Sequence, residues 1–230
     1  MDEAQAYLEE SARLNGQVGN QAHGVFIQLG EIAHSREDYQ QAKIMYTKTL
    51  EQLELIGEKY VKSFALADLG ILARDEGDFQ LAESYIQQAL MTAKEVGGWG
   101  DGGFRLALLG QIEFLQGNLE GAKHDFKESL SIAKESQWRY PKIAPMLIFS
   151  NSYVNLQPRL AVRVLGALDA YWRSNLGEQA DPLMKREFDS AIAQARQRLD
   201  ESAFSAAWAE GEKMSLDEAL DLALKTLEEM

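Results

Sequence analysis

Three short stretches recur at a fixed interval and decide the fold: LGEIA at 29–33, LGILA at 69–73 and LGQIE at 109–113. Their glycines follow one another at intervals of 40 residues. A constant interval of this length is typical of proteins that stack one structural unit on the next. Such an array presents an extended surface, and it has no reaction centre of its own. The interval therefore predicts a stacked array whose role is to bind.

A second shared block lies downstream of each Leu-Gly pair. An alanine stands 12 residues after each glycine, at Ala42, Ala82 and Ala122, and a large apolar residue follows four positions later. Apolar residues at helical spacing on both sides of a turn predict a pair of helices. The glycine in each first helix costs about 1 kcal/mol relative to alanine. We therefore expect these glycines to mark close approach between helices, with the small alanines as the matching surface.

The turn between the two predicted helices has its own signature. Gly77 and Gly117 are suited to the left-handed conformation that ends a helix. One residue later, Asp78 and Asn118 stand where the N-cap of the second helix belongs, as Asp38 does in the first unit. The first unit carries Glu37 in place of the turn glycine, so we expect its turn to differ slightly.

The pattern of a large apolar residue, Leu-Gly and Ala-x3-aromatic resembles the tetratricopeptide repeat. That repeat has a usual period of about 34 residues, so we expect the additional residues to lie around 51–65 and 91–105, between the second helix of one unit and the first helix of the next. Longer helices there would resemble the long-repeat variety of bacterial signalling regulators. The resemblance implies an all-α fold, a right-handed αα-superhelix (a solenoid) closed by a C-terminal helical cap. We expect repeats over 1–176, with a partial unit at 1–19, units at about 20–57, 58–97 and 98–137, a degraded unit at 138–176, and a cap at 177–230.

Both ends of the array depart from the pattern. Residues 3–14 resemble the second helix of an earlier unit, and Ser150 replaces the glycine in the degraded unit. In the cap, Asp181-Pro182 predicts a helix start, a short helix is expected over 203–210, and Ser215–Glu218 matches a capping box that opens a last amphipathic helix. An end cap that hides the last apolar face is the favoured role; a helix that binds a partner is the alternative.

The tail carries a more specific resemblance. AVRVLGAL at 161–168, FSAAWAEG at 204–211 and MSLDEA at 214–219 resemble the C-terminal tail of bacterial STAND-type signalling ATPases, which include LuxR-like transcription regulators. The resemblance implies a C-terminal portion of such a regulator, with a sensor or interaction role and a protein, peptide or small inducer as its ligand. A free-standing scaffold that bridges other proteins is the alternative, and an enzyme with an unrecognised site is a third hypothesis.

By resemblance, the ligand lies in the concave groove that the first helices build. The side chains expected to face it form three rows: Gln28, Glu31 and His34; Asp68, Ile71 and Arg74; Leu108, Gln111 and Phe114. The first rows are polar and the last is largely apolar, a gradient suited to a peptide or helix with one apolar end. A core position for Leu108 and Phe114 is the alternative. Only Arg74 is basic, which disfavours a clamp for a C-terminal carboxylate.

Composition narrows the functional classes. The net charge of −13 and the lack of a basic stripe argue against direct contact with nucleic acid. There is no cysteine, and no apolar run approaches the roughly 20 residues that span a membrane. We expect no membrane association and a cytoplasmic location.

The residues that usually carry chemistry do not form a motif. His23, His34 and His124 lack metal-ligand spacing, and we expect His34 as a polar surface group near a helix end. The glycine-rich stretch 97–103 lacks the lysine and hydroxyl of a phosphate-binding loop, so we predict a flexible connection there. We therefore predict no enzyme activity, no cofactor and no metal.

Overall fold

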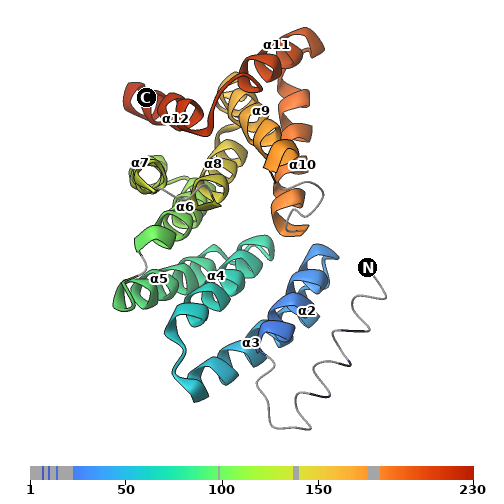
Figure 1. Cartoon of the computed structure of the whole chain (residues 1–230), viewed down its shortest axis with the longest axis vertical. Coiled ribbons are helices and arrows are strands. Elements are labelled where there is room, and N and C mark those ends of the chain that lie inside the picture. Colours follow the sequence, from blue (N-terminus) through green and yellow to red (C-terminus); the bar gives the residue numbers. More distant parts are fainter. Residues whose placement is uncertain are drawn as a thin grey trace. The chain divides into compact units, whose positions relative to one another are not determined.

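The computed structural model describes residues 23–97, 99–136, 140–175 and 182–230, together with residues 7, 10 and 14. Within these ranges it contains eleven helices and no strand (Figure 1), which confirms the predicted all-α fold. The helices are α2 (His23–Ser35), α3 (Tyr39–Ile56), α4 (Lys59–Asp75), α5 (Phe79–Glu95), α6 (Trp99–Gln116), α7 (Leu119–Glu135), α8 (Tyr140–Tyr153), α9 (Pro158–Asn175), α10 (Pro182–Arg198), α11 (Glu201–Gly211) and α12 (Leu216–Glu229).

The chain divides into two compact units, Met1–Gly98 and Trp99–Met230. The first unit contains the hairpins α2–α3 and α4–α5, and the second contains α6–α7 and α8–α9 followed by α10, α11 and α12. The division at 176/177 between repeats and cap stays a prediction. Of the helix predicted over residues 3–14, the structure describes only residues 7, 10 and 14, which are helical; Asp181 lies outside the described ranges.

The hairpin turns form as the N-cap residues predict. The side chains of Asp38, Asp78 and Asn118 accept hydrogen bonds from the N–H groups of Gln41, Leu81 and Gly121 at 3.1, 3.0 and 3.2 Å. These bonds satisfy donors that the first turn of a helix leaves without an intrahelical partner.

The first turn has the same backbone conformation as the others, contrary to the difference expected from Glu37. Gly77 and Gly117 each have a φ of 84°, and Glu37 adopts the same left-handed region with a φ of 62°. The hairpin geometry therefore imposes the conformation on whichever residue stands there, and Glu37 carries the steric cost that glycine avoids.

The repeated glycines mark a close approach of the two helices within each hairpin, as expected. A Cβ at Gly70 would lie 2.5 Å from Ile86 Cδ1 and 3.3 Å from the Ala82 carbonyl oxygen. At Gly30 it would overlap the Tyr46 ring. The large residue four positions after the alanine fills the space that the missing side chain leaves.

The additional residues of the repeat lengthen the helices where the first hairpin joins the second. Helix α3 continues to Ile56 and α4 begins at Lys59, with only Gly57 and Glu58 between them. Successive hairpins of the first unit then pack through Ala33, Ala42, Tyr46, Leu69 and Leu72, which form one buried cluster.

The predicted loop at 97–103 is wrong from Trp99 onward, because α6 begins there. Gly103 lies seven residues before Gly110, on the same face of that helix. A Cβ at Gly103 would lie 3.1 Å from the Ser129 carbonyl oxygen, and the Ser129 hydroxyl donates to the Gly103 carbonyl at 2.5 Å. The glycine is therefore a packing residue of the helix.

The tail is held by a close crossing of α9 and α11. A Cβ at Gly166 would lie 2.7 Å from the Trp208 carbonyl oxygen, and one at Gly211 would overlap the Arg163 carbonyl oxygen. Both glycines belong to the tail stretches 161–168 and 204–211, so those stretches have a packing reason for their composition. The capping box is confirmed, because Ser215 and Glu218 bond reciprocally at the start of α12.

Candidate binding surfaces

The last residue of each predicted groove row lies at a contact between helices. His34 is fully buried, and its Nε2 atom lies 2.9 Å from Asp75 Oδ2 on α4. Arg74 is also buried and donates from Nε and Nη2 to Asp75 Oδ1 at 2.8 and 2.6 Å. The rings of Tyr39 and Tyr46 approach the imidazole edge-on, with centroids 5.8 and 6.4 Å away. His34 is therefore a bridge between hairpins, and the predicted surface position is wrong.

The third row is mostly interior. Leu108 is 2% exposed and Gln111 is 6% exposed. Phe114 is half-buried, and its ring centroid lies 5.4 Å from that of Tyr153, just inside the end of α8. Leu108 thus occupies the core position that was the alternative interpretation. A binding role for the row stays a prediction, with Phe114 as its most accessible member.

The remaining four candidates lie at the surface of the first unit. Gln28 is exposed, and Glu31, Asp68 and Ile71 are half-buried. We call these four residues, on α2 and α4, the first-helix surface of the first unit. It combines two carboxyl groups, one amide and one aliphatic side chain, which suits a partner with basic and apolar groups.

In the second unit, a helix of the same chain covers the corresponding position of α8. Extending the third row by one interval of 40 residues gives Ile148, Asn151 and Val154. Gln194 of α10 donates to Asn151 Oδ1 at 3.1 Å and accepts from Asn155 Nδ2 at 2.9 Å. Arg198 Nε donates to Asn155 Oδ1 at 2.9 Å.

These bonds form a ladder between α10 and the last turn of α8 with the turn that follows it, and Asn151 Nδ2 extends it by donating to Glu187. Val154 packs with Ala195 of α10 in the same buried cluster. Sequence reasoning missed this contact, although Asn151 and Asn155 are four residues apart, as are Gln194 and Arg198. Two such pairs of polar side chains at helical spacing were the available signal.

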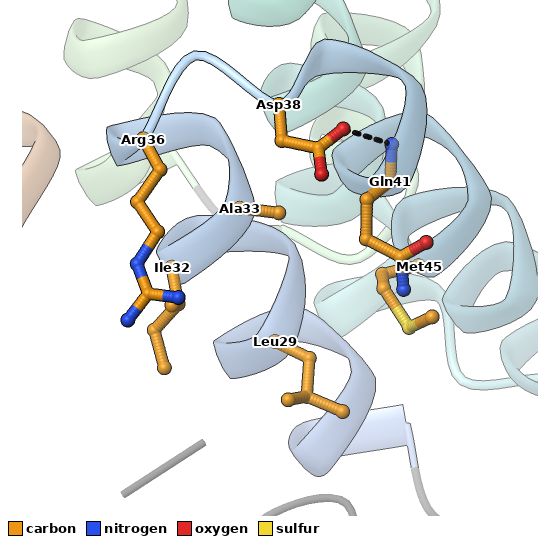
Figure 2. A pocket seen from close by; sticks show the side chains of 7 residues that line it. All are labelled: Leu29, Ile32, Ala33, Arg36, Asp38, Gln41 and Met45. Carbon is orange, nitrogen blue, oxygen red and sulfur yellow. Dashed lines mark hydrogen bonds between the residues drawn. The ribbon is translucent and has the colours of Figure 1, made fainter. Parts of the chain in front are cut away.

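A small pocket lies in the first hairpin and lacks all nine candidates. Figure 2 shows its lining, which comes from both helices and the turn between them: Leu29, Ile32, Ala33, Arg36, Asp38, Gln41 and Met45. Its volume of about 80 Å³ is well below the roughly 300–1,000 Å³ of small-molecule sites. We assign it no ligand.

One buried carboxyl group has an altered affinity for protons. Burial raises the pKa of Asp125 on α7 to about 6, and the negative charge of Glu113 on α6 acts in the same direction. Among the described residues, no three His, Asp or Glu side chains are grouped so that they could hold a metal ion. Asp125 therefore matters for the stability of the second unit.

Residues 21–95 match the family model of the tetratricopeptide repeat. This range contains both hairpins of the first unit, and it shows a tetratricopeptide repeat region there. Repeats of this class generally mediate contacts between proteins. No match was found among curated proteins. None of the helices in the described ranges combines the length and apolar character that crossing a bilayer requires.

Proposed function

We propose that the chain is a non-catalytic, cytoplasmic binding module and that it serves as the sensor or interaction region of a STAND-type bacterial regulator. The repeat match at 21–95 supports a protein-binding role. The close crossing at Gly166 and Gly211 gives a structural basis to two of the tail stretches that carry the resemblance.

The observation that carries the binding mode is the polar ladder between α8 and α10. In it, the end of α8 and the turn after it hold another helix of this chain through amide, carboxylate and guanidinium groups. The ligand of the first unit is accordingly a protein segment, helical and rich in Lys or Arg, that contacts Glu31 and Asp68. Binding changes the activity of the parent regulator only if the segment prefers one of its two states.

A crosslinking experiment tests this assignment in the source cell. A photoreactive benzoylphenylalanine placed at Gln28 or Ile71 should capture one protein, and the charge reversals Glu31→Lys and Asp68→Lys should abolish the product. The same group at Met91, which is exposed on α5 of the same unit, is the matched control. Equal capture from Met91, or capture that survives both reversals, would contradict the assignment.

A free-standing scaffold remains the second candidate, because an interaction module of this repeat class is compatible with either role. The identity of the captured protein distinguishes the regulator from the scaffold. Capture of a nucleotide-binding domain, or such a domain encoded in the same reading frame as this chain, supports the regulator. Two unrelated proteins captured together support the scaffold.

A further inference from the structure

A hollow in the second unit lies beneath the start of α12. It has a volume of about 390 Å³ and is bounded by the start of α8, the last turns of α9 and the α11–α12 turn. This volume falls within the range of sites for small organic molecules. Its wall is apolar at Ala167, Ala170 and Leu216 and polar at Ser174, Lys142 and Asp217.

Lys142 gives the pocket a positive group that is held away from water. The residue is 8% exposed, and its ammonium pairs with the carboxylate of Asp217, whose side chain is 66% exposed. A buried cation needs an anion beside it, because burial without one is costly. The first turn of α12 adds the positive end of a helix dipole at the same wall.

We propose that this pocket binds a small organic acid, whose carboxylate pairs with Lys142 in place of Asp217 and whose apolar body lies against Ala167, Ala170 and Leu216. The exchange is inexpensive for the protein, since Asp217 is mostly exposed and returns to water. The ligand acid gains a cation that is already desolvated and held in place, which strengthens the charge-assisted contact.

Binding at this pocket acts on α12. That helix is joined to α7 and α8 by three ion pairs, Lys127–Glu228 at 3.1 Å, Lys134–Asp221 and Lys142–Asp217. A ligand acid replaces the pair nearest the N-terminus and leaves the other two intact. The pocket shares no residue with the first-helix surface, so the test of this proposal is independent of the test of the proposed function.

Sodium phenylacetate is a suitable probe, with uncharged phenylacetamide as its matched control. Titration of the full chain, followed by amide chemical shifts, should show saturable changes at Ser215–Glu218 with phenylacetate and none with phenylacetamide. Lys142→Met keeps the apolar stem and should weaken binding by about tenfold or more. Asp217→Asn removes the competing anion and should tighten binding by about threefold.

Lys134→Met is the control variant, because it removes a different ion pair of α12 and lies outside the pocket lining. Its affinity for phenylacetate should equal that of the unmodified chain. Equal responses to the acid and the amide would overturn the proposal, and so would unchanged affinity in Asp217→Asn. Circular dichroism would report whether Lys142→Met folds. If it does not, Asp217→Asn still tests the proposal.

Discussion

The imidazole of His34 and the carboxylate of Asp75 lie 2.9 Å apart, so one pair of side chains joins the first tetratricopeptide hairpin to the second. The same carboxylate also accepts two hydrogen bonds from Arg74. Because Arg74 and His34 are buried, removal of their shared anion should cost far more than loss of a surface pair. Asp75→Ala should lower the free energy of unfolding by about 2–4 kcal/mol in urea titration.

The exposed pair Lys59–Glu95 in the same unit provides the control. Glu95→Gln removes one of its charges without disturbing a buried group, so it should change stability much less. Similar losses in the two variants would show that the Asp75 contacts contribute no more than surface charges do.

Gly211 should be intolerant of even one methyl group. Alanine there would place its Cβ against the Arg163 carbonyl oxygen, which belongs to the backbone of α9 and cannot rotate away. We expect Gly211→Ala to lower the free energy of unfolding by about 3 kcal/mol or more, measured by urea titration. Gly24→Ala is the matched control, since an added Cβ there has no neighbour within 4 Å, and helix propensity predicts a gain of up to about 1 kcal/mol. A mild effect at Gly211 would mean that α9 and α11 separate readily.

The strain at Glu37 predicts a stabilising substitution. Glu37→Gly removes the steric cost of a positive φ and adds backbone freedom to the unfolded chain, so the net gain should be about 0.5–1 kcal/mol. Gly77→Ala introduces the same strain into the second hairpin and should cost a similar amount. Thermal unfolding of both variants checks the pair, and effects of the same sign would contradict the explanation.

Asp125 predicts a dependence of stability on pH. Its folded pKa of about 6 exceeds the unfolded value of about 4, so folding favours the protonated acid. That stabilisation is complete below about pH 4 and is lost as the pH rises through 6. Asp125→Asn should therefore raise the free energy of unfolding by about 1–2 kcal/mol at pH 7.5 and change it little at pH 3.5. Urea titrations at the two pH values measure this, and an effect equal at both would refute it.

Local sequence signals were sufficient for the hairpins. The spacing from Gly70 to Ala82 locates the crossing of two helices, and Asp78 marks the start of the second, because each effect depends on residues close together in the chain. The capping box at Ser215 was predictable for the same reason. Glycine was misleading at Gly103, where its small size serves packing as it does at Gly110, and where composition alone favoured a loop.

Contacts between distant segments could not be predicted from these signals. His34 resembles a solvated polar residue until Asp75, in the next hairpin, is placed beside it. The position of α10 over α8 depends on side chains about 40 residues apart, such as Asn151 and Gln194. The accessible part of the predicted groove therefore became clear only when tertiary contacts showed which row members the protein itself occupies.

In the three ion pairs that join α12 to α7 and α8, each lysine comes from α7 or α8 and each acid from α12. The charges of all three pairs can therefore be exchanged together. Asp217→Lys, Asp221→Lys and Glu228→Lys together should loosen α12, and the further changes Lys127→Glu, Lys134→Glu and Lys142→Glu should then restore it. The C-terminal helix could thus be made to pair only with an α7 and α8 that carry the matching charges, and it could be exchanged between variants that share those charges.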